Sequence, residues 1–169
     1  MFRIWIGNLG KYNEGELVGE WVDLPCDDFD EVFERIGIND EYEEIFIADH
    51  DNDYGYCVGE YDNLDMLNEV AEELEGLSDY ECDVYEALHD DGLNHDEVME
   101  IIRQDNYICW WNCNSMSDVA YATFEAGGQL AEIEKCIDPM YIDWDAIGRD
   151  LSIEGSYYSC NNGYIEVLR

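Results

Sequence analysis

The middle of the chain, residues 60–105, combines a dense run of carboxylates with apolar residues at helical spacing. This stretch contains seventeen Asp and Glu but only one Lys or Arg, Arg103. Apolar residues recur three or four positions apart, which is typical of short amphipathic helices. Because such helices bury one stripe and turn their other faces to water, the carboxylates must lie on exposed faces. The sequence therefore predicts helices at 63–76, 79–91 and 95–104, packed as one small acidic bundle.

A solvated acidic surface is the ordinary explanation of such a run, but here the acidic excess extends over the whole chain. The sequence contains 7 Lys and Arg against 43 Asp and Glu, for a formal net charge of −36. Charge at this level can cause disorder through self-repulsion. The apolar fraction of 47% and the aromatic fraction of 14% nevertheless supply enough residues for a core. We therefore expect a folded protein that carries more charge than solubility requires.

The charge also limits the classes of partner. Nucleic acid and anionic membrane surfaces would repel this chain, whereas a strongly basic surface would attract it. DNA-binding clefts are common surfaces of that kind. Duplex DNA carries one negative charge per about 1.7 Å of axis, so a charge of −36 equals that of about 18 base pairs. A dimer would match about 36 base pairs.

Ahead of the acidic middle, residues 1–60 predict a small α+β unit. Two stretches rich in apolar residues are expected to pair as strands, and the glycine-rich segment between them is typical of a turn. A helix follows, because Phe29, Val32 and Ile36 form one apolar stripe behind a capping aspartate. The expected elements are strands at 2–9 and 17–24, a turn at 10–15, a helix at 29–36 capped by Asp27 or Asp28, and a strand at 44–48.

The segment after the third strand matches part of a calcium-binding EF-hand loop. Positions 1, 3, 5 and 12 of that loop are occupied by Asp49, Asp51, Asp53 and Glu60. The position that needs glycine is Tyr54, and the segment before the loop is a predicted strand instead of a helix. We therefore expect an acidic turn here, with a calcium site as the competing interpretation, and we assign no metal ligands.

After the acidic middle, residues 106–169 predict a second α+β unit. Residues 106–113 contain no acids and two adjacent tryptophans, which is typical of a strand buried on both faces. The other expected elements are a helix capped by Ser117 and closed by Gly127-Gly128, helices at 130–136 and 143–151, and a hairpin of 153–160 and 164–168 with a type I′ turn at Asn161-Asn162-Gly163.

This last unit contains more apolar surface than about 60 residues can bury alone. A ligand platform is a less favoured role for the tryptophan pair than packing in a core or an interface. We therefore predict a homodimer through residues 106–169. The predicted interface residues are Trp110, Trp111, Val119 and Phe124.

The sequence contains no recognisable catalytic constellation. His50, His89 and His95 lie near acids, but none pairs with Ser or Cys in a nucleophile motif. The seven cysteines include no Cys-x-x-Cys pair, which favours reduced thiols in the cytoplasm. Neither a secretory signal nor an apolar run of membrane-spanning length is evident. We therefore predict a cytoplasmic protein with no enzyme activity and no cofactor.

Three segments resemble one known family. They are IGNLGKYNEGELVGEWVDLP at 6–25, IGINDEYEE at 36–44 and DWDAIGRDL at 143–151. All three are similar to the ArdA antirestriction proteins, and the run NLGKYNEGELVG is long and specific. Residues 130–143 resemble the region of that family's short antirestriction motif, whereas residues 49–53 depart from the family pattern.

The resemblance implies an elongated α+β chain of three small domains. Here these would be residues 1–60, an acidic helical domain at 61–105, and residues 106–169 with the dimer interface. It also implies a protein of mobile genetic elements that mimics bent DNA. The partner would be a type I restriction-modification enzyme, whose methyltransferase core offers the DNA-binding groove, and neither nucleic acid nor membrane would be bound. The competing function is that of an acidic calcium-buffering or chaperone-like protein.

Carboxylates of the middle segment are the candidate imitators of phosphate. Residues four apart on a helix have Cβ atoms about 5–6 Å apart, which is comparable to the spacing of neighbouring phosphates on one strand. The predicted binding residues are Glu60, Asp62, Asp65, Glu69, Glu72, Glu73, Asp79, Glu86, Asp90, Glu97 and Glu100.

Overall fold

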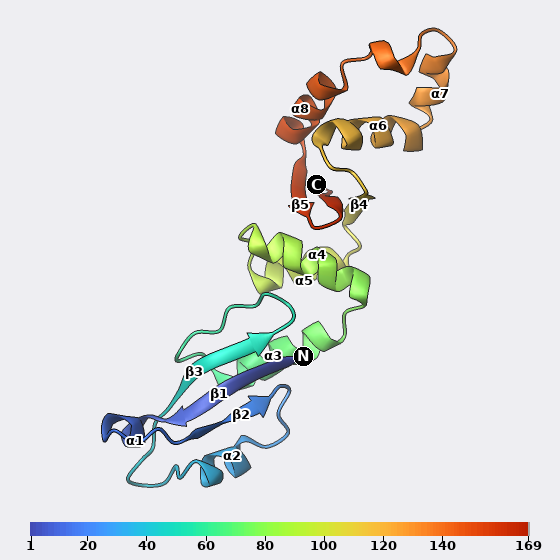
Figure 1. The fold of residues 1–169 in the computed structure, drawn as a ribbon. Coiled ribbons are helices and arrows are strands. Elements are labelled where there is room, and N and C mark those ends of the chain that lie inside the picture. The colour runs from blue at the N-terminus through green and yellow to red at the C-terminus, as the bar shows by residue number, and fades with distance from the viewer. Residues whose placement is uncertain (169) are drawn as a thin grey trace. The chain divides into compact units, whose positions relative to one another are not determined.

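The computed structural model describes residues 1–168 and shows an α+β fold of short helices and two small sheets (Figure 1). The chain divides into two compact units, Met1–Cys82 and Asp83–Arg169. The division falls within helix α4 (Asp79–Asp90). The predicted boundaries of three domains are not tested by this division and stay a prediction.

The first unit is built around an antiparallel sheet with the strand order β2-β1-β3. Alternate residues of the central strand, Phe2, Ile4 and Ile6, are almost fully buried and form its core face. Figure 1 shows β1 between its two neighbours. The elements of this part of the chain are β1 (Phe2–Asn8), α1 (Leu9–Asn13), β2 (Gly19–Asp23), α2 (Phe29–Arg35), β3 (Ile45–Asn52) and α3 (Leu64–Glu75).

Helix α1 replaces the turn predicted at residues 10–15. The side chain of Asn8 caps this helix by accepting from the backbone N of Lys11 at 3.0 Å. Asn8 is fully buried, and its amide also donates to the carbonyl oxygens of Ile36 and Gly37, both at 3.2 Å. The neutral side chain of Asn8 therefore caps α1 and connects it to the C-terminal end of α2. The N-terminal cap of α2 is Asp28, one of the two predicted capping residues.

Strand β3 is longer than predicted, and this corrects the interpretation of the segment after it. Asp49 and Asp51 lie within the strand, where they pair with Trp5 and Arg3 of β1. The guanidinium of Arg3 donates to Asp51 at 2.7 Å. An EF-hand loop needs a tight turn at these positions. The extended backbone is incompatible with such a loop, and the expected acidic turn begins only after Asn52.

Helix α3 is confirmed close to its predicted limits. It belongs to the first unit, whereas α5 (His95–Arg103) and most of α4 belong to the second. Asn68 on α3 exchanges two hydrogen bonds of 2.8 Å with the backbone of Cys26, just before α2. The fully buried residues Leu67, Ala71 and Leu74 of α3 have the spacing of three or four positions that the sequence predicts for an amphipathic helix.

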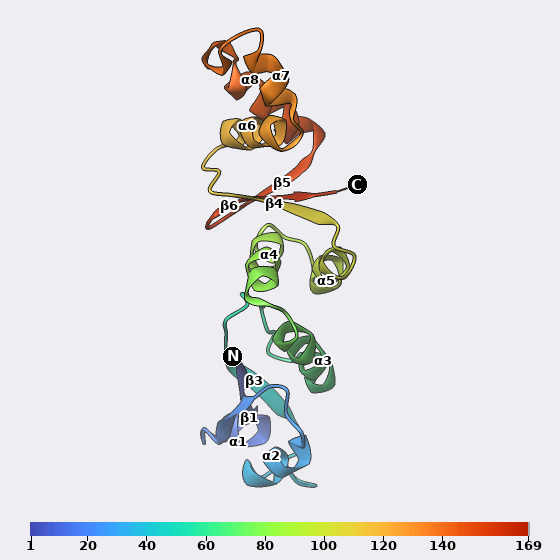
Figure 2. The ribbon, with the colours of Figure 1, turned by 90° about the vertical axis from the view of Figure 1, so that its right-hand side faces the viewer.

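The second unit contains the antiparallel sheet β4-β6-β5, with the fully buried Ile165 on its central strand. Figures 1 and 2 show this sheet between α4 and α5 on one side and α6 on the other. After α5 come β4 (Tyr107–Trp111), α6 (Met116–Ala126), α7 (Gln129–Glu134), the 3-10 helix η1 (Pro139–Tyr141), α8 (Trp144–Glu154), β5 (Ser156–Cys160) and β6 (Gly163–Val167).

Three details of the second unit differ from the predictions. Strand β4 is not buried on both faces, since Ile108 is 40% exposed. Helix α6 is capped by Ser115, and Ser117 instead hydrogen-bonds Asp145 of α8. The turn of the β5–β6 hairpin is not type I′, because a type I′ turn needs positive φ at both central residues and neither Asn161 nor Asn162 has a positive φ.

No helix within residues 1–168 is long and apolar enough to cross a bilayer.

Helices α6 and α8 approach closely at Gly148, and this contact is testable. A Cβ atom at residue 148 would lie 2.5 Å from the backbone C and O of Met116. Gly148→Ala should therefore force the helices apart and lower the free energy of unfolding by about 1–3 kcal/mol. Urea denaturation followed by tryptophan fluorescence measures this loss. Ser152→Ala, on an exposed face of the same helix, is the control and should change stability by less than about 0.5 kcal/mol. Equal midpoints for the two variants would contradict the close packing.

Candidate functional site

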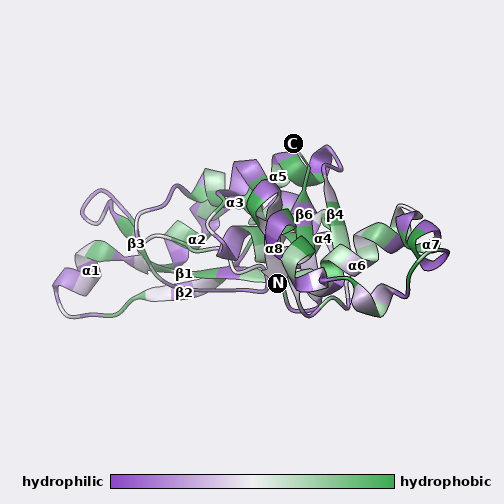
Figure 3. Cartoon of the chain, turned by 90° about the horizontal axis from the view of Figure 1, so that it is seen from above, coloured by the Kyte–Doolittle hydropathy of each residue, from purple (hydrophilic) through white to green (hydrophobic). Residues whose placement is uncertain are grey.

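Helix α3 presents a row of carboxylates to solvent. Asp65, Glu69 and Glu72 are exposed and follow the spacing i, i+4, i+7, which places them on one helix face. Glu73, also predicted, is half-buried at the side of this row. The mixture of hydrophilic and hydrophobic stretches along α3, α4 and α5 is visible in Figure 3.

Helix α4 carries a longer row of the same kind. Asp79, Asp83, Glu86 and Asp90 follow the spacing i, i+4, i+7, i+11, and all are exposed except the half-buried Glu86. At 1.5 Å per residue the row is about 16.5 Å long, or one carboxylate per about 5.5 Å. One DNA strand carries a charge per about 3.4 Å of axis. The helix therefore presents negative charge at a lower but comparable linear density.

Asp83 belongs to this row although it was not among the predicted residues. Asp83 lies four positions after Asp79 and three before Glu86, and this spacing places all three on one helix face. The omission shows that a charge row is better identified from its helical face than from individual acids.

The remaining predicted acids lie outside these two rows, and several have local partners. Glu60 is exposed in the loop before α3. A carboxylate that accepts one hydrogen bond keeps free lone pairs for a cationic partner. Three of these acids accept a local hydrogen bond. Asp62 accepts from the backbone N of Gly59 at 2.7 Å, and Glu97 accepts from the backbone N of Asn94 at 2.9 Å. Glu100 accepts from Gln104 Nε2 at 2.9 Å.

Within residues 1–168, the acids of the two rows, Asp65, Glu69 and Glu72 on α3 and Asp79, Asp83, Glu86 and Asp90 on α4, have no counterion. The ion pairs of Arg3, Lys11, Arg35 and Lys135 are made with acids outside residues 60–105. Among residues 1–168, no acid of either row makes an ion pair. Carboxylates without an internal ion pair are available to an external cation.

The four predicted interface residues are placed differently from one another. Val119 is fully buried within its own unit and offers no surface to a partner. Trp110, Trp111 and Phe124 are half-buried. The Phe124 ring packs edge-on against Trp144 with centroids 5.5 Å apart.

Trp110 is also held by a polar contact in the sheet. Its Nε1 donates to Glu166 Oε2 at 2.9 Å. Burial and a hydrogen bond to the same carboxylate raise the pKa of Tyr157 to about 12. Glu166 therefore links side chains of all three strands of this sheet.

The row on α4 should weaken the fold at low salt. Like charges at i, i+4 destabilise a helix by about 0.2–0.5 kcal/mol per pair. Asp83→Asn relieves the repulsion from Asp79 and Glu86, so it should raise the free energy of unfolding by about 0.4–1 kcal/mol. In about 1 M salt the Debye length is about 3 Å, and the gain should disappear. Thermal denaturation at both salt concentrations measures the effect, and the unaltered protein should itself melt higher as salt increases. Destabilisation by Asp83→Asn, or a gain independent of salt, would contradict this account.

Comparison with known proteins gives a match over nearly the whole chain. The family described as "Antirestriction protein (ArdA)" matches residues 4–166. No curated protein matches the chain. The match includes both units, the two acidic rows and all three segments in which the sequence resembles this family. The chain therefore belongs to the ArdA family of antirestriction proteins.

Proposed function

We propose that this antirestriction protein inhibits type I restriction-modification enzymes by imitating DNA. Its exposed carboxylates occupy the DNA-binding groove of the methyltransferase core and exclude the substrate. The observation that carries this proposal is the row Asp79, Asp83, Glu86 and Asp90, which has no intramolecular ion pair within residues 1–168. The family supports an inhibitor, and it does not support the calcium-buffering or chaperone-like alternative.

The physical basis of inhibition is electrostatic competition. A DNA-binding groove holds Lys and Arg at positions set by the phosphates, and DNA binding gains free energy from the release of condensed counterions. Carboxylates at a comparable spacing contact the same cationic side chains. Inhibition then needs occupancy of the groove and no bond-making step by the inhibitor.

The proposal includes the assembly and the domain arrangement. We propose three domains, at residues 1–60, 61–105 and 106–169, in an elongated cytoplasmic homodimer encoded by mobile genetic elements. The dimer contact is formed by Trp110 and Phe124, without the buried Val119 and without Trp111, which lines a hollow of its own unit. Two chains of charge −36 together carry the charge of about 36 base pairs.

The binding free energy should be distributed over many carboxylates. An exposed ion pair contributes about 0.2–1 kcal/mol. Single variants Asp90→Asn, Glu97→Gln and Glu100→Gln should therefore weaken inhibition by no more than about fivefold. Eight amide substitutions made together, each costing about 0.5 kcal/mol of binding free energy, should weaken inhibition by about a thousandfold. The block consists of amide substitutions at Glu69, Glu72, Glu73, Asp79, Glu86, Asp90, Glu97 and Glu100.

The measurement is competition between the protein and DNA for a purified type I methyltransferase. Circular dichroism and thermal denaturation of each variant verify that it is folded. Affinity should also fall as salt rises, as it does for a DNA complex. Complete loss of inhibition from one amide substitution, with no effect of substitutions at the neighbouring acids, would indicate a discrete site and contradict DNA mimicry by distributed charge.

The dimer gives a separate expectation. Light scattering at micromolar concentration should report a mass of twice 19.6 kDa. The block variant should keep this mass, because its substitutions lie on α3, α4 and α5 and not at the proposed interface. A monomer mass for the unaltered protein would refute the proposed assembly.

A further inference from the structure

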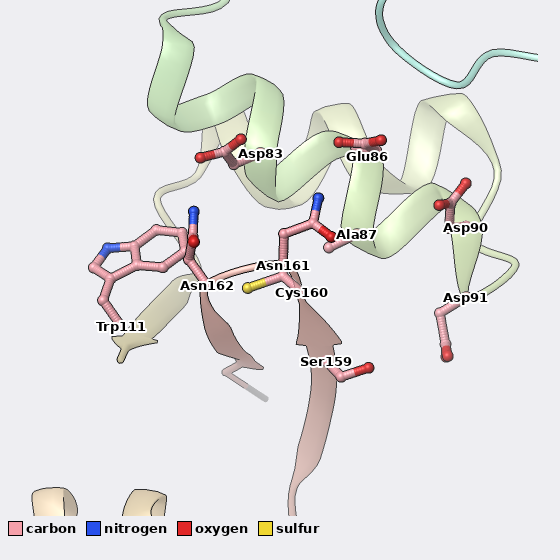
Figure 4. Close-up of a pocket in the computed structure, with 10 residues that line it drawn as sticks. All are labelled: Asp83, Glu86, Ala87, Asp90, Asp91, Trp111, Ser159, Cys160, Asn161 and Asn162. Atoms are coloured by element: carbon pink, nitrogen blue, oxygen red, sulfur yellow. The ribbon is translucent and has the colours of Figure 1, made fainter. Parts of the chain in front are cut away.

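The second unit contains a hollow between α4 and the β5–β6 hairpin (Figure 4). Its volume of about 380 Å³ lies at the lower end of the range for small-ligand sites, which is about 300–1,000 Å³. Helix α4 contributes Asp83, Glu86 and Asp90 to one wall, and Asp91 follows directly. Trp111 and the hairpin residues Asn161 and Asn162 contribute to the opposite wall.

The two walls differ in chemistry. The α4 wall is anionic, and none of its four carboxylates makes an ion pair within the part of the chain that the structure describes, residues 1–168. The hairpin wall contains an indole ring, two carboxamides and no carboxylate. Figure 4 shows Asn161 and Asn162 pointing toward α4, with the Trp111 ring beside them.

This combination fits a planar cation. A guanidinium can donate two parallel hydrogen bonds to a carboxylate and stack on an aromatic ring at the same time. The ring contact is favourable for a cation within about 6 Å of the ring centroid. A lysine ammonium is compact and strongly hydrated, and it has no flat face with which to stack. The amide oxygens of the asparagines can accept the remaining guanidinium hydrogens.

We propose that the hollow receives an arginine side chain from the basic surface of the inhibited enzyme. This inference rests on the proposed function and adds a discrete contact to the distributed charge. DNA offers a phosphate at such an arginine but no indole ring facing a row of acids. The hollow therefore gives the protein a contact that a simple imitation of the phosphate backbone would lack.

Two variants with equal loss of charge separate this contact from general electrostatics. The hollow variant carries Asp83→Asn, Glu86→Gln and Asp90→Asn. The control carries Asp65→Asn, Glu69→Gln and Glu72→Gln on the exposed row of α3. The hollow variant should weaken inhibition about tenfold more than the control. Equal weakening would overturn the arginine contact and leave the proposed function intact, whereas inhibition unaffected by both variants would overturn the proposed function.

Substitution of Trp111, which leaves the net charge unchanged, tests the indole ring of the hairpin wall. Trp111→Leu should weaken inhibition by about threefold to tenfold, and Trp111→Phe should retain most of it because the ring face is kept. Unchanged inhibition by a folded Trp111→Leu protein would overturn the proposal.

A direct probe of the unaltered protein avoids any question of misfolding. N-acetyl-arginine amide is titrated at constant ionic strength and followed by 15N NMR at the side chains of Trp111, Asn161 and Asn162. Saturable shifts confined to the hollow are expected, with weaker shifts for the lysine analogue and none for the neutral citrulline analogue. Equal shifts for lysine, or shifts spread over all acidic helices, would overturn the assignment of an arginine site.

Discussion

Repulsion among carboxylates is the constraint that every element of this protein must offset. A chain with a formal charge of −36 and 7 basic side chains cannot neutralise itself through ion pairs. Burial of apolar stripes supplies the opposing free energy, at roughly 25 cal/mol per Å² of apolar surface removed from water. Each acidic helix accordingly keeps one fully buried stripe, with Leu67 and Leu74 on α3, Val84 and Leu88 on α4, and Val98 on α5. The carboxylates occupy the faces that remain.

Neutral amides make many of the tertiary connections for which basic side chains are too few. Asn8 joins β1 to the end of α2, and Asn68 joins α3 to the segment before α2. Near the C-terminus, Asn106 Nδ2 donates to the carbonyl oxygen of Leu168 at 2.7 Å. An asparagine donates and accepts without changing the net charge. These connections therefore hold the fold together without using the carboxylates of the proposed binding surface.

The success of the sequence predictions depended on how local each signal was. The three middle helices were predicted close to their observed limits, because apolar periodicity and end residues such as Asn94 and Gly76 act within one turn. The grouping of those helices stays a prediction. The contact of α3 with Cys26, 42 positions before Asn68, depends on a long-range hydrogen bond that no local pattern shows. Strand β3 extends through Asp49 and Asp51 because β1 supplies hydrogen-bonding partners, which no local pattern shows.

The candidate site was predictable to a similar degree. Helical spacing places the acids in rows, and the same spacing would have included Asp83. The hollow was not predictable, because it depends on the approach of Asn161 and Asn162 to a helix about seventy positions earlier in the chain. The burial of Val119 likewise depends on packing within the unit, which composition alone cannot reveal.

The charges at the ends of the acidic helices give a direction to the proposed binding surface. Helix dipoles favour anions at the first turn and cations at the last, by about 0.3–1 kcal/mol per charge. The last turn of α3 has no basic residue, and that of α4 has only His89. Glu75 and Asp90 lie instead at these carbonyl-rich ends. A cationic group placed there meets the side-chain carboxylate and the negative end of the dipole together. Helices α3 and α4 are therefore polarised in a way that α5, with Arg103 in its last turn, is not, and their C-terminal turns favour an external cation.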